Sequence, residues 1–200
     1  FPKLAFLDYR YTESLDLTTT RDTAVDALSH LIEAYLSRRS SFVSDILVDA
    51  GLKLWGQCVE DLVSGAISAG VRESLLVASC LGGMAIAHTG TTVVHALGYP
   101  LTYFHGVSHG RANGILLTEY LKYNQEVAKS RVERILSRLN LKERGQFGQL
   151  MLTLAPQEFQ LSQHQINEYA VAASRTKNAS HSLGDLTPQA CIDILQRSLN

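Results

Sequence analysis

The chain has 200 residues, enough for one sizeable hydrophobic core, and 46% of them are hydrophobic while 18% are charged. The formal net charge of -1 comes from scattered acidic and basic residues, which excludes the basic surface typical of a nucleic-acid-binding protein. No apolar run approaches the roughly 18 residues of a membrane span and no signal peptide opens the chain, so we expect a cytoplasmic protein that does not enter a membrane.

The first element predicted along the chain is a short strand. Residues 4–8, LAFLD, form an apolar run between Pro2 and a polar stretch. A strand needs a neighbouring strand to satisfy its backbone hydrogen bonds, and no other strand is predicted. We therefore expect residues 1–20 to be the strand and loop that remain from a missing domain, and residues 21–200 to be a helical domain.

Helical periodicity dominates the rest of the sequence. The first helix is capped at Asp22 or a neighbouring threonine, and the last begins with Pro188. Pro100 ends the fourth predicted helix, because an interior proline removes a backbone donor. The predicted helices cover residues 22–37, 42–63, 71–87, 91–97, 109–123, 125–139, 145–154, 162–175 and 188–199. This pattern predicts an all-α protein built as a multi-helix bundle.

Four side chains on these helices are candidate ligands of one divalent metal ion. Asp26 and His30 are four residues apart, which places them on one face of a helix, one turn apart. His95 lies in an apolar helix and His109 at the start of another, so they would approach from separate elements. Asp26 is alternatively a carboxylate that the dipole of its helix stabilises near the N-terminus. The mixed nitrogen and oxygen donors suit Fe²⁺, Zn²⁺, Mn²⁺ or Ni²⁺.

Histidines are concentrated around the two later candidates. Residues 85–113 contain four of the seven histidines in the chain, His88, His95, His105 and His109. A single histidine on an apolar helix is more often a core residue than a ligand, but clustering favours a functional site. A buried neutral imidazole at His95 also needs partners for both nitrogens, which a metal ion and a hydrogen-bond acceptor would provide.

Three blocks of the sequence resemble the iron-containing, group III alcohol dehydrogenase family. They are DALSHLIEAYLS at residues 26–37, VVHALGYPL at residues 93–101 and HGVSHGRANGILL at residues 105–117. The resemblance covers most of the first 125 residues, while the remainder matches only as continuing helices. It implies that Asp26, His30, His95 and His109 bind Fe²⁺, or Zn²⁺ in some members. It also implies a helical domain of the dehydroquinate synthase-like type.

The same resemblance implies an activity for the intact protein. Family members carry an N-terminal α/β domain that binds NAD or NADP, and they interconvert an alcohol and an aldehyde or ketone. The metal would polarise the substrate oxygen while the nicotinamide exchanges a hydride. Because the nucleotide-binding domain is missing here, we expect this fragment alone to be inactive. The family also suggests a homodimer or a larger assembly that acts on a small-molecule alcohol or aldehyde.

One position departs from the family pattern. The family usually has a second histidine near the substrate, four residues after the one that matches His95, and Tyr99 occupies this position. Tyr99 can donate a hydrogen bond, but an unperturbed pKa near 10 makes a phenol a poorer proton shuttle than an imidazole. His88 or His105 is a candidate to take over this catalytic relay, and each is equally well interpreted as a cleft-lining or surface residue.

Other protein classes fit parts of the pattern. A lyase related to dehydroquinate synthase, or a zinc enzyme related to glycerol dehydrogenase, would keep the metal and change the substrate pocket. A metal hydrolase would need a general base, for which Glu33 is the only acidic residue next to the Asp26 and His30 pair. The simpler interpretation of Glu33 is a solvated helix carboxylate. A non-catalytic helical module would hold no metal at all.

Overall fold

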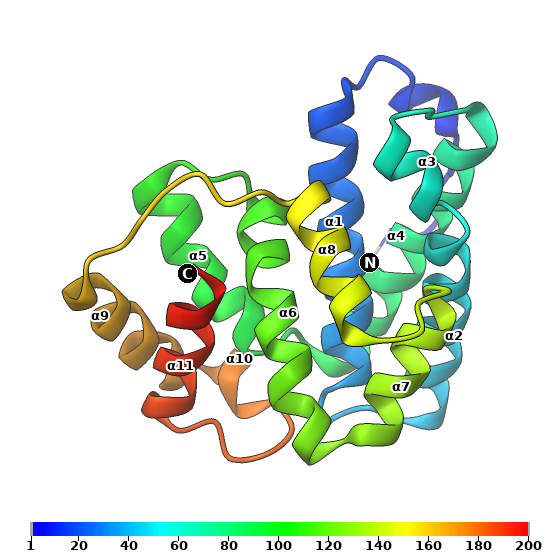
Figure 1. Cartoon of the computed structure of the whole chain (residues 1–200). Coiled ribbons are helices and arrows are strands. Elements are labelled where there is room, and N and C mark those ends of the chain that lie inside the picture. Colours follow the sequence, from blue (N-terminus) through cyan, green and yellow to red (C-terminus); the bar gives the residue numbers. More distant parts are fainter. Residues whose placement is uncertain (1, 200) are drawn as a thin grey trace.

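The computed structural model describes residues 2–199, and within them it contains eleven α-helices and one short 3-10 helix (Figure 1). The predicted all-α fold is therefore confirmed. The helices are η1 (Tyr9–Thr12), α1 (Leu17–Tyr35), α2 (Phe42–Gly56), α3 (Val59–Ser64), α4 (Ala69–Thr89), α5 (Val93–His105), α6 (His109–Val127), α7 (Lys129–Arg138), α8 (Arg144–Leu154), α9 (Gln163–Ser174), α10 (Lys177–Ser180) and α11 (Pro188–Ser198). Residues 1 and 200, the ends of the two predicted domain ranges, lie outside the described residues.

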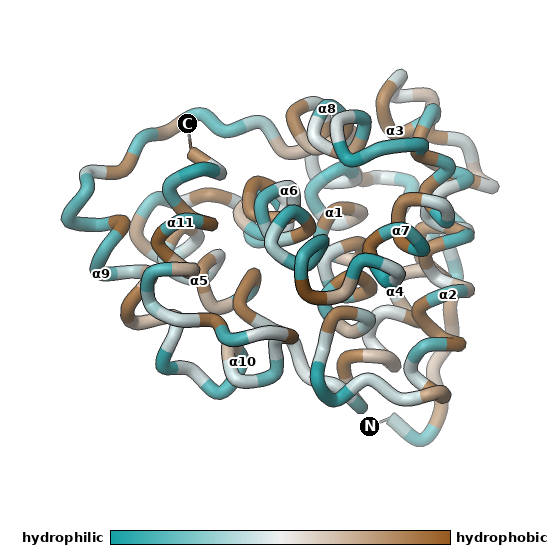
Figure 2. Tube along the Cα trace, turned by 60° about the horizontal axis from the view of Figure 1, so that its bottom comes forward, coloured by the Kyte–Doolittle hydropathy of each residue, from teal (hydrophilic) through white to brown (hydrophobic). Residues whose placement is uncertain are grey.

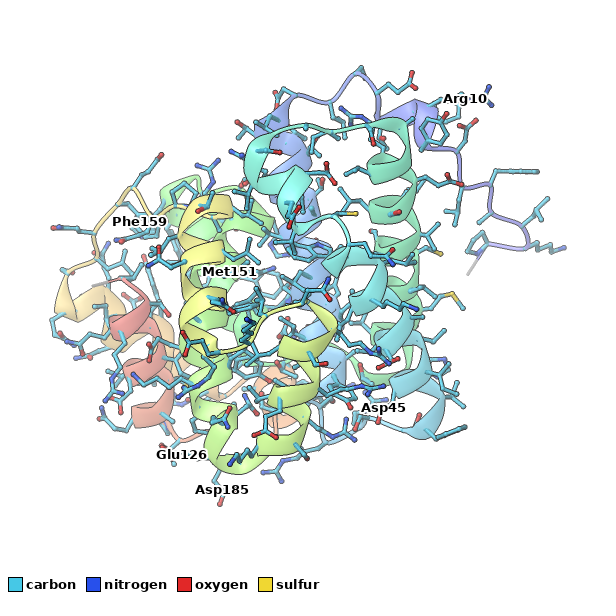
Figure 3. The ribbon with its side chains drawn as sticks, turned by 45° about the vertical axis from the view of Figure 1, so that its right-hand side comes forward. Arg10, Asp45, Glu126, Met151, Phe159 and Asp185 are labelled. Atoms are coloured by element: carbon cyan, nitrogen blue, oxygen red, sulfur yellow. The ribbon has the colours of Figure 1, made fainter. Side chains whose placement is uncertain are left out.

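The strand predicted at residues 4–8 is not formed. These residues have no regular secondary structure, and the side chains of Leu4 and Phe6 are 71% and 87% exposed. Figure 3 shows the segment before Arg10 leaving the body of helices. A strand needs a partner ladder, and within residues 2–199 the β pairing amounts to one isolated bridge between Ser37 and Ser182. Residues 4–8 therefore have the apolar composition of a strand but no adjacent strand to pair with among the described residues.

The first long helix begins earlier than predicted. The Asp16 carboxylate accepts a hydrogen bond from the backbone N–H of Thr19 at 2.7 Å, and this side-chain cap starts α1 at Leu17. Asp22, the predicted cap, lies inside α1 and is buried. The boundary expected at residue 20 therefore falls within a helix.

Two further helix boundaries differ from the prediction. The helix predicted over residues 42–63 is divided into α2 and α3 around Cys58. At this point the end of α2 is in close contact with the end of α7. Gly56 allows the contact, since a Cβ at this position would overlap the carbonyl oxygen of Arg138. The helix predicted to stop before Pro100 continues as α5 to His105, although Pro100 cannot donate a backbone hydrogen bond. Extensive packing of α5 on α6 accompanies this continuation.

Helix α6 is the central element of the bundle. It lies between α1, α7 and α8 on one side and α5 and α11 on the other (Figure 1), and it contacts all five. Apolar and polar residues alternate along most helices (Figure 2), as expected when one face of each is buried. The largest fully buried side chains include Trp55, whose indole Nε1 donates to the carbonyl oxygen of Ala24 at 2.7 Å, and Tyr120 of α6.

Helix α4 packs along α1 and α2. Gly82 gives close contact with α1, because a Cβ at this position would lie 3.4 Å from the Cβ of His30. Among the described residues, α4 is the one helix long and apolar enough to cross a membrane, with a mean hydropathy of 1.3 over its most apolar stretch. Length and composition are weak evidence for a span, since a core helix of a globular protein meets the same criteria. In the bundle, α4 serves as a packing partner of the helix that carries Asp26 and His30.

The C-terminal helices are tied back to the end of α1. The backbone N–H of Arg38 donates to the carbonyl oxygen of His181 at 2.7 Å. The backbone N–H of Leu183 donates to the carbonyl oxygen of Leu36 at 3.3 Å. The guanidinium of Arg38 adds a hydrogen bond of 2.7 Å to the carbonyl oxygen of Ser182, which is 144 residues away in sequence. These bonds hold the segment between α10 and α11 against the residues that follow α1.

Ion pairs join α2 to α7. Asp49 accepts hydrogen bonds from Arg134 at 2.8 Å and from Arg138 at 2.7 and 2.6 Å. Asp45, labelled in Figure 3, pairs with Arg131 one turn earlier. The hydrogen bonds from Arg138 are the largest cause of a lowered pKa for Asp49, and together with those from Arg134 they outweigh the effect of partial burial.

The pair of helices yields a prediction about acid stability. Because the folded state lowers the pKa of Asp49, the carboxylate stabilises the fold above its ordinary pKa near 4, and this contribution is lost as the pH falls through the folded-state value. We expect Asp49→Asn to lower the free energy of unfolding at pH 7 by about 0.5–1 kcal/mol. Urea denaturation at pH 7 and about pH 3 measures this, and the difference between variant and wild type should shrink at the lower pH.

Glu133→Gln is a matched control, because Glu133 forms only an exposed pair with Lys129 at 3.8 Å. It should leave the free energy of unfolding unchanged at both pH values. If Asp49→Asn lowered the free energy of unfolding by the same amount at both pH values, the charge of Asp49 would not be the source of the stabilisation.

Candidate metal centre

The structure brings the four predicted ligands together. Helix α1 supplies Asp26 and His30, α5 supplies His95, and α6 supplies His109. Asp26 Oδ1 lies 3.8 Å from His95 Nε2 and 3.6 Å from His109 Nε2. His30 Nε2 lies 3.0 Å from His95 Nε2 and 4.0 Å from Asp26 Oδ2. Asp26, His95 and His109 therefore form one compact group of possible metal ligands, whose ligand atoms all lie within 4.8 Å of one another, and His30 adjoins this group through His95.

A close contact between α1 and α6 places His109. A Cβ added at Gly110 would overlap the backbone carbonyl oxygen of Asp22, so only glycine allows the two helices to approach this closely. The Asp22 carboxylate then accepts hydrogen bonds from the hydroxyl of Ser108 and, at 3.2 Å, from Nε of Arg111. The first turn of α6 is thereby held on α1, with His109 directed towards Asp26.

The three imidazoles differ in exposure and in charge preference. The His95 side chain is 3% exposed, compared with 21% for His30 and 37% for His109. Burial lowers the pKa values of His30 and His109 and outweighs the opposing charge of Asp26. Both imidazoles are therefore held in the neutral form that a metal ligand requires. Burial acts in the same direction on His95, but the charge and hydrogen bond of Glu33, with the charge of Asp26, raise its pKa overall.

The donor set fits a divalent cation. Ligand atoms about 2.0–2.2 Å from one ion lie roughly 3–3.5 Å apart, depending on the geometry. The four separations given above run from 3.0 to 4.0 Å, close to that range. Two neutral imidazoles cannot both direct lone pairs at each other across 3.0 Å without a shared proton or a cation between them. Imidazole nitrogen and carboxylate oxygen are suitable donors for Fe²⁺ and Zn²⁺.

Glu33 is not a solvated helix carboxylate. It is fully buried, and its Oε2 accepts a hydrogen bond from Nδ1 of His95. Its Oε1 accepts from the backbone N–H of Thr92 at 2.7 Å. Burial opposes the charged form, but the charge and hydrogen bond of His95 and the bonds from Thr92 together lower the pKa of Glu33. Because both oxygens are occupied, Glu33 is also unsuited to be the general base of a hydrolase.

Asn113 is a component of the site that the sequence analysis did not identify. It lies four residues after His109, one turn along the same face of α6, which is the spacing that could have indicated it. Its Nδ2 donates to Asp26 Oδ1 at 3.0 Å and lies 3.2 Å from His95 Nε2. Its Oδ1 is buried without a partner among the described residues and points at Gly98, where a side chain would collide with it. Asn113 thus braces the Asp26 carboxylate from inside the bundle.

Of the three catalytic candidates, Tyr99 lies beside the candidate metal ligands. Its ring stacks on that of His109, with centroids 5.7 Å apart and an interplanar angle of 12°, and meets His95 edge-on at 6.1 Å. Tyr99 is 50% exposed, so it forms part of the open rim of the site. Burial is the main cause of its raised pKa, with the charges of Glu33 and Asp26 adding to it, and the phenol therefore stays protonated near neutral pH.

The other two catalytic candidates lie outside the ligand cluster. His105 Nε2 is 3.1 Å from the hydroxyl of Tyr169, and its ring stacks on Phe159, which Figure 3 shows in the segment between α8 and α9. His88 is exposed in the last turn of α4. Within residues 2–199, neither has a hydrogen bond to a metal ligand, to Glu33 or to Asn113.

Comparison with known proteins places the chain in a family. The family described as Fe-containing alcohol dehydrogenase, C-terminal, matches residues 20–184. A probable alcohol dehydrogenase of Escherichia coli is 33% identical over 143 residues, which is 71% of this chain and 36% of that protein. An iron-containing alcohol dehydrogenase of Thermotoga maritima, solved as a crystal structure, is 35% identical, with a TM-score of 0.89. That similarity covers 100% of this chain and 54% of the solved chain.

A solved sulfoacetaldehyde reductase of Bifidobacterium kashiwanohense, in complex with NAD+, has the same fold with a TM-score of 0.88 and 23% identity, over 100% of this chain and 55% of that one. The fold is a helical domain that holds a cluster of histidine and aspartate side chains where three of its helices meet. The chain belongs to the Fe-containing alcohol dehydrogenase family and matches its C-terminal part. It spans about half the length of these solved relatives and a smaller share of the Escherichia coli protein.

The contact between α1 and α6 gives the second prediction. Gly110→Ala would force the two helices apart, and we expect the free energy of unfolding to fall by about 2 kcal/mol or more and metal affinity to fall with it. Gly83→Ala is the matched control, because Gly83 is exposed on α4 with no atom within 4 Å of an added Cβ. It should raise stability by up to about 1 kcal/mol, since alanine favours a helix.

Urea denaturation and Zn²⁺ titration of both variants measure these effects. Unchanged stability and unchanged zinc affinity in Gly110→Ala would show that the close contact does not position His109.

Proposed function

We propose that the helices from α1 onwards are the metal-binding helical domain of an NAD(P)-linked alcohol dehydrogenase or aldehyde reductase, and that the segment before α1 connects this domain to a nucleotide-binding domain. The observation that supports this most is the convergence of Asp26, His30, His95 and His109 from three helices. Family membership and the alcohol dehydrogenases among the relatives give independent support.

The donors present fit Fe²⁺ or Zn²⁺, and such an ion, when bound, would supply Lewis acidity towards the oxygen of an alcohol or aldehyde. The residues of the chain have separate parts in this function. Asp26 contributes a negative charge that Asn113 orients. His95 is fixed from inside the bundle by Glu33, whereas His109 is half exposed and borders the side from which a substrate can approach.

Tyr99 is proposed to donate a hydrogen bond at the rim of the site. Its phenol remains protonated near neutral pH, so it can donate but does not exchange protons readily. Its stacking on His109 places the ring next to the ligand on the exposed side. His88 and His105 are retained as candidates for proton relay only in the assembled enzyme, because neither touches the ligands in this domain.

The cofactor and the assembly belong to the whole protein. We propose NAD or NADP as the hydride carrier, bound by the nucleotide-binding domain, and a related structure in complex with NAD+ supports this choice. A small alcohol or aldehyde is the proposed substrate, in keeping with the names of the relatives. The expected homodimer and cytoplasmic location are proposals of the same kind.

Metal analysis tests the assignment. Protein purified without chelators should contain close to one equivalent of iron or zinc, and His95→Ala and His109→Ala should each lose most of it, because each removes one of few strong donors. His105→Ala is the control, since His105 bonds to Tyr169 instead of to the ligands, and it should keep its metal. Stoichiometric metal in both of the first two variants would rule out the site.

The role of Tyr99 is tested in the full-length enzyme. Tyr99→Phe keeps the ring stacked on His109 and removes the hydroxyl. We expect unchanged metal content and a roughly tenfold lower kcat for NAD(P)-linked alcohol oxidation, the loss typical of one hydrogen bond in a transition state. Tyr99→His should restore kcat at least in part, because it supplies a donor at the same position. Equal kcat in wild type and Tyr99→Phe would exclude a catalytic hydroxyl.

A further inference from the structure

We propose that Glu33 is a positioning residue that selects the tautomer of His95 and thereby makes Nε2 of this imidazole available to the metal. The inference rests on the metal site of the proposed function. Glu33 contacts the candidate site through His95, and both of its carboxylate oxygens accept hydrogen bonds from α5 and the residue before it.

The first oxygen of Glu33 is held by three donors. Oε1 accepts from the backbone N–H of Thr92 at 2.7 Å, from the hydroxyl of Thr92 at 2.6 Å and from the backbone N–H of His95 at 3.3 Å. These groups belong to the N-terminus of α5, where Thr92 makes no capping bond of its own. Glu33 therefore serves as the cap of α5 from a different helix, and it is 0% exposed.

The second oxygen of Glu33 faces His95. Oε2 is hydrogen-bonded to Nδ1 of His95, and a carboxylate can only accept. The proton of a neutral His95 is therefore held on Nδ1, which leaves the lone pair on Nε2. Nε2 is the nitrogen that lies 3.8 Å from Asp26 and 3.0 Å from the imidazole of His30. Glu33 thus directs the free lone pair of His95 into the ligand cluster.

Glutamine at position 33 would reverse this arrangement. Because Thr92 and His95 direct three donors at the Oε1 position, the amide of a glutamine must place its oxygen there. The NH₂ group would then face Nδ1 of His95 and donate to it. A neutral imidazole that accepts at Nδ1 carries its proton on Nε2, pointing at the metal position. The fold would keep its hydrogen bonds while the ligand would be blocked.

The experiment compares wild type with Glu33→Gln in two measurements. Competition with a chelator measures Zn²⁺ affinity, which we expect to fall about 10- to 100-fold in the variant. Nitrogen-15 NMR of the metal-free protein, at a pH where His95 is neutral, should show Nδ1–H in wild type and Nε2–H in Glu33→Gln. Glu119→Gln makes the same chemical change in a pair with Lys122 and should alter neither result.

Zinc affinity and the tautomer of His95 decide the proposal. Zinc affinity of Glu33→Gln equal to that of wild type would overturn the proposal, as would Nε2–H in wild-type His95. If Glu33→Gln fails to fold, the wild-type tautomer alone decides, and Nε2–H there refutes the proposal. A wild-type protein that binds no metal would refute the proposed function, whereas the tautomer of its His95 would still report on Glu33.

Discussion

The close packing of α6 between α1 and α5 is the constraint on which the site depends. Gly110 removes the side chain that would separate α6 from α1, and Gly98 makes room for Asn113 between α6 and α5. Because both contacts lie beside the ligands, the helix axes are close enough for short side chains to meet. A side chain at position 110 would push α6 away from α1 and would carry His109 away from Asp26. Two glycines therefore set the spacing of the helices around the candidate ligands.

The two carboxylates near the ligands have different environments and different parts in the site. Asp26 is 26% exposed and faces the imidazoles directly. Glu33 is fully buried, and an isolated charge there would be strongly unfavourable. Its cost is offset by four hydrogen bonds, three of them at the start of α5, where the helix dipole also favours a negative charge. With a divalent ion, the two carboxylates would make the whole assembly neutral, which suits a partly buried position.

Much of the helical pattern was predictable from the sequence, as was the position of Asp26 and His30 on one helix face, because both depend on local spacing. Asp26 and His30 are fixed relative to each other by one helical turn, and the glycine and histidine blocks around His95 and His109 resemble a known family. The role of Glu33 was not predictable. Its spacing from His30 indicates the same helix face, but only tertiary packing shows that this part of the face is buried under α5.

The other differences arose partly from a choice among local capping residues and partly from contacts between distant segments. The start of α1 depended on a choice among several capping residues, of which Asp16 forms the hydrogen bond to Thr19. The end of α5 was predicted from the local effect of Pro100, which packing against α6 overrides. Residues 4–8 are an apolar run, and a strand was predicted there for that reason. A strand forms only beside another strand, which these residues do not have in the described part of the chain.

The bonds that tie the segment after α10 to the end of α1 have a consequence for how the chain folds. They join residues 144 positions apart, and closing so long a loop is entropically costly and slow compared with local helix formation. The candidate metal ligands and the residues that contact them, Glu33 and Asn113, all lie between positions 26 and 113 of the sequence given. We expect this part to collapse first during synthesis, and α9 to α11 to dock afterwards as a late, kinetically separate step that locks α5 and α6 in place.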